Sequence, residues 1–424
     1  MRWTSKIAAA ALAALLQACV TAPVSAPPPA AASAAETRAP VTILVSIDGF
    51  RADYLDRGVT PVLSRLAAGG VTGPMRPSFP SKTFPNHWTL VTGLRPDRHG
   101  IVGNKMEDAA RPGETFTMST DDPFWWNGAP PIWTDAEAAG IRTATLFWPG
   151  SNVAIGGTRP DPKEWEVEGG ARPQDWAQFN QAVSGEQRVN GLLDWLRRPA
   201  AIRPKLLTLY FDTVDHVSHD YGPVDPHTLD AVAQVDGWIG QLVAGLADLG
   251  QPANLVIVAD HGMAATSSAR VAQLYEYVAK EDVHVIESGV YAALAPVAGK
   301  EDAVGKALLG KHPHFECWRK SEIPARFHFG SNPRVAPIFC LAETGWLLNE
   351  KPPAKPFAGG NHGYDNFAPD MAALFIANGP AFRAQRIAAF DNVDVYPLLR
   401  DLIGLPAKPG VDGTDAPFRS ALRR

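Results

Sequence analysis

Short apolar runs alternate with helical patterns along this chain, and this alternation constrains its fold more than any other feature. The runs cover Val41 to Ile47, Thr143 to Trp148, Leu206 to Phe211, Asn254 to Ala259 and Ala372 to Ala377. Strands that alternate with helices are typical of an α/β fold with a mostly parallel central sheet. We therefore expect such a sheet, flanked by helices, at the centre of the protein.

The longest helical pattern runs from about His227 to Leu249, where apolar residues recur at spacings of three and four. It predicts a helix that covers one face of the sheet. Two segments, Gly150 to Gln187 and Glu301 to Pro356, lack a clear period, and we expect both to be irregular insertions near the functional edge of the sheet. We expect residues 41–424, including both insertions, to form one catalytic domain.

The N-terminal residues 1–18 have the pattern of a secretory signal peptide. Arg2 and Lys6 precede an apolar stretch, Ile7 to Leu16, that is too short to span a bilayer. The segment Leu16 to Cys19 is similar to a bacterial lipobox, although Gln17 stands where a small residue is usual, so lipidation of Cys19 stays an open alternative. We expect an exported protein that is either periplasmic or lipid-anchored.

Residues 19–40 are rich in Ala and Pro, which is typical of a flexible tether. Beyond them the chain has two cysteines, Cys317 and Cys340. In an oxidising compartment these two residues are expected to form one disulfide, and two buried thiols are the alternative.

The composition is that of an ordinary globular protein, with 46% hydrophobic and 20% charged residues among 424. The net charge of -5 is spread along the chain without a basic run. A polynucleotide-binding surface needs clustered Lys and Arg, so we expect no polynucleotide binding.

Acidic residues follow three of the apolar runs, namely Asp48, Asp212 and Asp260. In open α/β sheets, ligands bind outside the carboxyl ends of the strands, which is where these side chains would lie. A single aspartate at such a position is more commonly a helix cap or a turn former. The acids alone therefore do not define a site.

Histidines near these acids favour a metal site. His216 lies four residues after Asp212, His261 follows Asp260 directly, and His362 comes from a glycine-rich loop. Imidazole and carboxylate together suit zinc. Asp48, Asp212 and Asp260 supply three carboxylates, and these three histidines complete a set of six ligands, which is enough for two ions.

Four further polar residues receive other interpretations. His87, His99 and His219 lie beside turns or polar neighbours and are interpreted as structural or supporting residues. Asp215 either accepts a hydrogen bond from a ligand histidine or faces solvent. We therefore leave these residues out of the predicted ligand set.

A candidate nucleophile, Thr83, precedes Pro85 at the start of a predicted short helix that runs through Val91. The N-terminus of a helix favours a phosphate, and an adjacent metal would stabilise the threonine alkoxide. The alternative is that Ser81 or Thr83 merely caps this helix.

Six segments together resemble the nucleotide pyrophosphatase/phosphodiesterase family of the alkaline phosphatase superfamily. They are Val45 to Arg51, Phe79 to His87, Thr92 to Asn104, Tyr210 to His216, Ala259 to Met263 and Gly360 to Asp365. The resemblance extends from Val41 to about Leu405 and agrees in the order, spacing and type of residue. It implies an alkaline phosphatase-like fold.

The resemblance also implies roles for single residues. One zinc would be held by Asp212, His216 and His362, and the second by Asp48, Asp260, His261 and the oxygen of Thr83. Asn104 would bind a phosphate oxygen. Thr83 would attack phosphorus to give a phosphothreonine, which a water molecule then hydrolyses.

The substrate that the resemblance favours is a nucleotide diester or pyrophosphate, cleaved to release a nucleoside monophosphate. Phe84 resembles the family's aromatic residue that packs on a nucleobase, with an ordinary hydrophobic contact as the alternative, and Trp165 or Trp176 would form the other side of the base site. The family also contains hydrolases of lysophospholipids and choline-phosphate esters, so lipid-derived diesters or monoesters remain an alternative. A non-catalytic, zinc-stabilised binding protein is disfavoured because the ligands and the nucleophile are all present.

Overall fold

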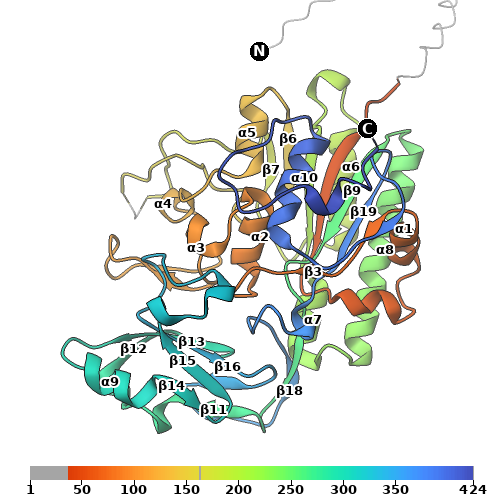
Figure 1. Cartoon of the computed structure of the whole chain (residues 1–424). Coiled ribbons are helices and arrows are strands. Elements are labelled where there is room, and N and C mark those ends of the chain that lie inside the picture. Colours follow the sequence, from red (N-terminus) through yellow and green to blue (C-terminus); the bar gives the residue numbers. More distant parts are fainter. Residues whose placement is uncertain (1–36, 162–163, 424) are drawn as a thin grey trace, which may run out of the picture. The chain divides into compact units, whose positions relative to one another are not determined.

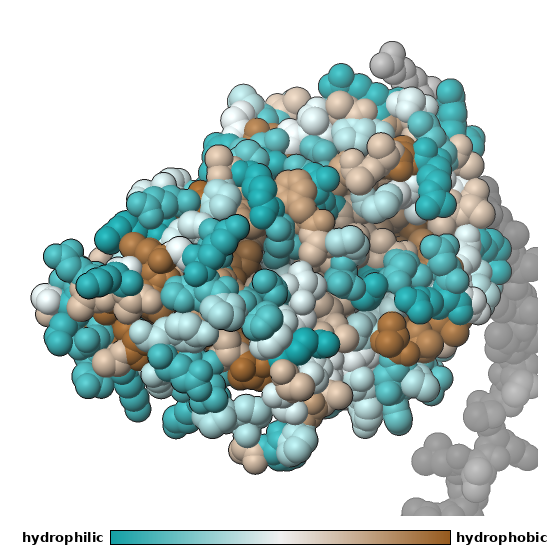
Figure 2. Space-filling view, turned by 60° about the horizontal axis from the view of Figure 1, so that its bottom comes forward, coloured by the Kyte–Doolittle hydropathy of each residue, from teal (hydrophilic) through white to brown (hydrophobic). Residues whose placement is uncertain are grey.

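The computed structural model describes residues 37–161 and 164–423, and the segment Ala39–Arg424 forms one compact unit. The predicted signal peptide, residues 1–18, and Cys19 lie outside the described residues, as does most of the tether. Within the described part of the chain, no helix is long and apolar enough to cross a membrane. On the face drawn in Figure 2, hydrophobic residues form separate groups among hydrophilic ones.

A central sheet of eight strands confirms the predicted α/β fold, and its strand order is β20-β2-β19-β9-β1-β8-β6-β7. Its middle strand, β1 (Val41–Ile47), is parallel to both β8 (Leu206–Phe211) and β9 (Ala253–Val258). Every residue of β1 and β8 is buried, which explains their unbroken apolar runs. The other members are β6 (Thr143–Leu146), β7 (Asp175–Ala177), β19 (Phe375–Asn378), β2 (Val71–Thr72) and β20 (Gln385–Arg386), of which β19 is antiparallel to β9 and β2.

Helices cover both faces of this sheet, with α1 and α8 on one side and α2 and α10 on the other (Figure 1). The predicted long helix is α8 (Pro226–Asp248), whose N-cap Asp225 accepts a hydrogen bond from the His227 main-chain nitrogen. The remaining helices are α1 (Pro61–Ala68), α2 (Thr83–Thr92), α3 (Pro96–His99), α4 (Pro123–Trp126), α5 (Ile132–Ala138), α6 (Gly185–Leu196), α7 (Thr213–Tyr221), α9 (Glu301–Leu308) and α10 (Val395–Leu402).

The segment from Glu301 to Pro356 is not irregular, so that prediction is wrong. It contains α9, β17 (Leu347–Asn349) and three strands of a second, antiparallel sheet of five strands, which begins before Glu301 (Figure 1). The strands of this sheet in chain order are β12 (Val283–Glu287), β13 (Tyr291–Pro296), β14 (Gly310–His312), β15 (Phe315–Arg319) and β16 (Ile338–Ala342). All five strands are short, and β12, β14 and β15 are only partly buried, so their apolar pattern is weak.

Cys317 and Cys340 are joined by a disulfide in this second sheet. They lie directly opposite each other on β15 and β16, and both are buried. Four two-stranded pairs complete the fold: β3 (Met75–Arg76) with β21 (Phe390–Asp391), β4 (Met106–Glu107) with β5 (Thr115–Phe116), β10 (Ala264–Ser267) with β18 (Ala358–Asn361), and β11 (Val271–Gln273) with β17 (Leu347–Asn349).

Asp394, next to the first turn of α10, carries a buried carboxyl group. Its pKa is raised from 3.8 to about 6, and burial is the largest cause. The nearby Asp391 also raises the pKa, whereas Arg95 and a hydrogen bond from the Thr414 main-chain nitrogen lower it. Between about pH 4 and this raised pKa, the unfolded chain binds fewer protons here than the folded chain. The contribution of Asp394 to the free energy of unfolding therefore falls as the pH rises through this interval.

We expect Asp394→Asn to remove this pH dependence, because asparagine still accepts the Thr414 hydrogen bond but does not titrate. The variant should gain stability relative to the unaltered protein between about pH 4 and pH 6, and keep that advantage at higher pH. Urea unfolding of both proteins at several pH values measures the difference. A difference that does not vary with pH would contradict the expectation.

Candidate active site

The carboxyl ends of β1, β8 and β9 meet at one edge of the central sheet, as the sequence predicted. Asp48 follows β1, Asp212 follows β8, and Asp260 with His261 follows β9. Thr83 faces them from the first position of α2. The parallel strands therefore bring residues from distant parts of the sequence to one place.

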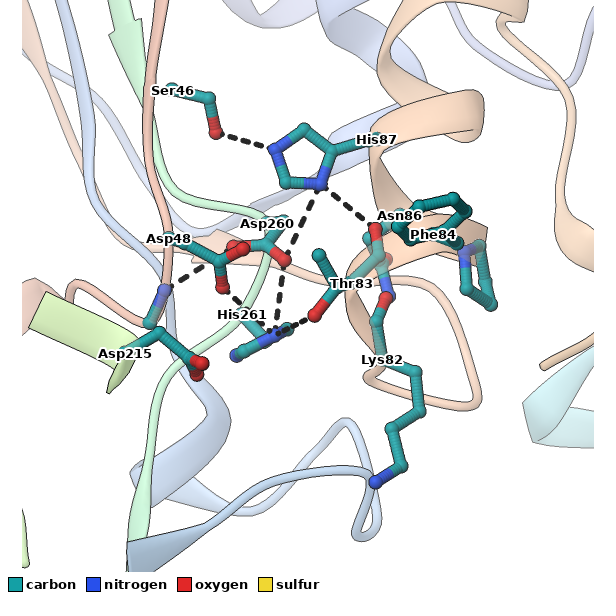
Figure 3. Close-up of polar contacts among 12 residues, drawn as sticks. Ser46, Asp48, Lys82, Thr83, Phe84, Asn86, His87, Asp215, Asp260 and His261 are labelled. Atoms are coloured by element: carbon teal, nitrogen blue, oxygen red, sulfur yellow. Dashed lines mark hydrogen bonds and ion pairs between the residues drawn. The ribbon is translucent and has the colours of Figure 1, made fainter. Parts of the chain in front are cut away.

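The first group of candidate metal ligands consists of Asp48, Asp260 and His261, all buried, with one donor atom from each lying within 4.8 Å of the others. Nε2 of His261 is 3.0 Å from Oδ2 of Asp260 and 3.4 Å from Oδ1 of Asp48. The hydroxyl oxygen of Thr83 lies 3.3 Å from the same nitrogen (Figure 3).

The second group contains Asp215, His261 and His362, so His261 belongs to both. Nε2 of His362 is 3.6 Å from Oδ1 of Asp215. His219, one turn further along α7, brings its Nε2 to 3.4 Å from Oδ2 of Asp215. We therefore count His219 with this group.

The three histidines share a tautomer that leaves one nitrogen open for a cation. Nδ1 of His219, His261 and His362 lies 2.9, 2.9 and 3.0 Å from the main-chain oxygens of Gly360, Gly262 and Ser81, respectively. A carbonyl oxygen accepts only, so each Nδ1 carries the proton and each Nε2 presents a lone pair. This is the arrangement found in histidines that bind metals.

The charges in these groups also fit divalent cations. Among the described residues, Oδ1 of Asp48, Oδ1 of Asp215 and Oδ2 of Asp260 are buried and accept no hydrogen bond. Burial, Asp260 and Asp215 raise the pKa of Asp48 well above its usual value. Buried acceptors that face one another are costly unless a cation lies between them. The donor set of oxygen and imidazole nitrogen can thus hold two ions.

The predicted pairing of Asp212 and His216 with His362 needs correction, because the structure brings Asp215 and His219 to His362 instead. Asp212 accepts a hydrogen bond of 2.8 Å from Nη1 of Arg188, and His216 is exposed. Both aspartates have a histidine four residues later, and residues four apart share one face of a helix, so spacing alone could not choose between the pairs.

The side of α7 that packs against the sheet distinguishes the two pairs. Its buried residues are Val214 and Ser218, which directly precede Asp215 and His219. A helical register that turns those two positions inward also brings the next residues close to the sheet.

His87 and His99 support the site and belong to neither ligand group. Nδ1 of His87 donates to the main-chain oxygen of Thr83 at 2.8 Å, and its Nε2 lies 2.8 Å from the Ser46 hydroxyl. Burial lowers the pKa values of His87 and His99, the latter to about 3, which keeps both rings neutral.

Asn86 fixes the turn that leads into Thr83, a role that the sequence did not reveal. Its Nδ2 donates to the main-chain oxygens of Pro80 and Lys82, while its Oδ1 accepts from the Ser78 main-chain nitrogen and from Asn392. The side chain is fully buried. Both ends of the amide are thus used to hold the main chain next to Thr83.

A cavity of about 540 Å³ extends from Thr83, a volume usual for small-molecule sites. Phe84 and Trp126 line one part of it, and Phe179, 44% exposed, lines another. Oδ1 of Asn104, which also lines the cavity, accepts a hydrogen bond of 2.9 Å from the Phe84 main-chain nitrogen. The amide nitrogen of Asn104 therefore remains available as a donor to an anion.

Trp165 and Trp176, the predicted partners of Phe84, are 81% and 42% exposed and do not line this cavity. The aromatic residues that line it besides Phe84 are Trp126, Phe147, Trp148, Phe179 and Tyr210. A larger cavity, about 810 Å³, lies beside Arg51 at the edge of the sheet next to β2 and β20, and it contains no residue of the two ligand groups.

A mostly parallel sheet with these groups at its carboxyl ends is an alkaline phosphatase-like fold. Solved structures agree: the murine ectonucleotide pyrophosphatase/phosphodiesterase 5, as an inactive threonine-to-alanine variant in complex with AMP, has a TM-score of 0.84 and 34% identity, covering 91% of this chain and 100% of that one. The human protein of the same name gives a TM-score of 0.83 at 34% identity, covering 91% of this chain and 100% of that one.

Residues 42–365 match the family described as type I phosphodiesterase/nucleotide pyrophosphatase, and the chain belongs to this family. Ectonucleotide pyrophosphatase/phosphodiesterase family member 1 of Mus musculus is 36% identical over 393 residues, covering 88% of this chain and 42% of the relative. The chain thus spans less than half of that relative. Bis(5'-adenosyl)-triphosphatase of Xenopus laevis is 35% identical over 375 residues, covering 87% of this chain and 79% of the relative.

We expect His219→Ala to lower the divalent metal that the purified protein retains, whereas His216→Ala should retain the full amount. The two histidines lie on the same helix, so the second variant is a matched control for the first. Elemental analysis after dialysis measures the metal content. Loss of metal from His216→Ala together with full retention by His219→Ala would restore the pairing that the sequence suggested.

Proposed function

We propose that this protein hydrolyses phosphodiester or pyrophosphate bonds in nucleotides and releases nucleoside monophosphates. The observation that carries the proposal is the hydroxyl of Thr83, which lies 3.3 Å from Nε2 of His261 and opens onto a cavity with aromatic walls. Family membership supports it, as do the names of relatives that act on bis(5'-adenosyl) triphosphate or bind AMP.

Two zinc ions are the proposed cofactors. Asp48, Asp260, His261 and the Thr83 oxygen would hold one ion, and Asp215, His219 and His362 the other. Oxygen and imidazole ligands suit zinc. When bound, such a pair acts as a Lewis acid that lowers the pKa of a hydroxyl and neutralises charge that develops on phosphate oxygens.

The residues of the chain provide the rest of the mechanism. Thr83 attacks phosphorus, a bond from Thr83 oxygen to phosphorus forms, and the bond to the leaving oxygen breaks on the opposite side. Water then hydrolyses the phosphothreonine and restores the hydroxyl. The Asn104 amide donates to a phosphate oxygen, and the phenol of Tyr210 donates to Oδ2 of Asp48 at 2.6 Å, which turns Oδ1 toward the site.

We propose that the substrate base stacks between Phe84 and Phe179, which both line the cavity. Lipid-derived diesters and phosphate monoesters are the alternative substrates. The disulfide between Cys317 and Cys340 supports export to an oxidising compartment, in line with the predicted signal peptide. We propose that the exported protein is either free in the periplasm or held at a membrane by a lipid anchor at Cys19.

Thr83→Ala should lower kcat by at least about a thousandfold, because no other hydroxyl replaces the nucleophile. The variant should still bind both ions through its histidines and carboxylates. Turnover of thymidine 5'-(p-nitrophenyl phosphate) and elemental analysis test both parts. Activity close to that of the unaltered protein would remove Thr83 from the mechanism.

Phe84→Ala and Phe179→Ala should each raise KM for this nucleotide ester by about 5- to 150-fold, the range that corresponds to 1–3 kcal/mol of base stacking. Trp176→Ala, an exposed aromatic outside the cavity, is the control and should leave KM unchanged. Faster turnover of p-nitrophenyl phosphate or of a lysophospholipid by the unaltered protein would favour the alternative substrates.

A further inference from the structure

Arg188 is a buried cation beside the cavity, and no step of the proposed mechanism uses it. The residue, on α6, is 3% exposed. Its Nε donates to the main-chain oxygen of Val183 at 3.0 Å, and its Nη1 donates to the main-chain oxygen of Tyr210 at 3.1 Å and to Oδ1 of Asp212 at 2.8 Å. The guanidinium thus ties α6 to the end of β8.

The same guanidinium also faces two aromatic rings of the cavity wall. Its Cζ lies 5.1 Å from the ring centre of Phe147 and 5.4 Å from that of Phe179. The two rings meet edge to face, with centres 5.8 Å apart, and Phe179 makes a similar contact with Tyr210 at 5.7 Å. Arg188 therefore lies at the centre of the cluster that supports Phe179.

Phe179 depends on this cluster because its own segment offers little support. It lies in the loop between β7 and α6, and 44% of its surface is exposed. A ring in such a loop keeps one orientation only if its neighbours hold it. A desolvated cation over the ring face, together with two aromatic edges, supplies that restraint.

The shape of the guanidinium matters as well as its charge. Its planar fork donates to three acceptors, one before α6 and two at the end of β8, while its face remains against aromatic rings. A lysine ammonium would keep the charge and could pair with Asp212, but it could not make these contacts together. Arg188→Lys therefore separates the orienting role from simple neutralisation of Asp212.

We infer that Arg188 is a positioning residue for substrate specificity: it orients Phe179 in the cavity wall and so increases the affinity for substrates that carry a nucleobase. The inference rests on the proposed nucleotide function. Since Arg188 acts through Phe179, its loss should affect binding of the base and leave the attack by Thr83 unchanged.

The test compares two diesters with the same leaving group, thymidine 5'-(p-nitrophenyl phosphate) and methyl p-nitrophenyl phosphate, which has no base. Arg188→Lys should raise KM for the nucleotide ester about tenfold, the size of effect expected when a cation–π contact and an oriented stack are lost, with kcat nearly unchanged. The kcat/KM for the methyl ester should remain the same. An equal decrease in kcat/KM for both substrates, or no decrease for either, would overturn the inference.

Arg400→Lys is the matched control. Arg400 is 6% exposed, pairs with Asp135 and lies with its Cζ 5.5 Å from the ring centre of Tyr396, but neither of these partners lines the cavity, whereas Phe147 and Phe179 beside Arg188 do. This variant should lose stability on urea unfolding and keep the preference for the nucleotide ester. A shift in preference as large as that of Arg188→Lys would mean that any lost buried ion pair has this effect, and would overturn the inference.

A double variant tests whether Arg188 acts through Phe179. Arg188→Lys should raise KM little further when Phe179 is already alanine, whereas independent roles would give additive effects and contradict the inference. Measurements on the unaltered protein distinguish failure of the proposed function from failure of the inference. If it shows no preference for the nucleotide ester, the proposed function fails and the inference with it; if it shows the preference and Arg188→Lys retains it, the inference alone fails.

Discussion

Three carboxylates that face one another at the ends of buried strands and on α7 are the constraint on which the site depends. Asp48, Asp260 and Asp215 each have a buried oxygen that accepts no hydrogen bond from the described residues. Leaving such charges uncompensated costs several kcal/mol per ion in a protein interior. The fold orients the imidazole lone pairs toward the same place, so cations bound at this edge would offset the cost of burying these carboxylates.

The sheet and most of the site could be predicted because they follow from strong local patterns. Fully buried strands such as β1 and β8 must be apolar along their whole length, and this makes them visible in the sequence. Strand order then places Asp48, Asp260 and His261 together, since parallel strands end at one edge. Carboxylates and imidazoles that gather at one edge of a sheet are typical metal ligands, so these residue types predict a metal site.

The parts that sequence patterns missed depend on helical register and on loop geometry. Asp212 and Asp215 have the same spacing to a histidine, and the rotation of α7 against the sheet decides between them. Phe179 reaches the cavity from a loop without a period, whereas Trp165 and Trp176, more conspicuous in the sequence, turn to solvent. The second sheet has no strong sequence pattern because its strands are short and β12, β14 and β15 are only partly buried.

The way in which Thr83 is held has a consequence for substitutions beside it. Asn86 and His87 form hydrogen bonds with the nearby turn through main-chain atoms of Ser78, Pro80, Lys82 and Thr83. Side chains beside Thr83, including that of Phe84, can therefore change while these main-chain hydrogen bonds remain. A substitution that alters the cavity wall at Phe84 would thus leave the position of the Thr83 hydroxyl unchanged.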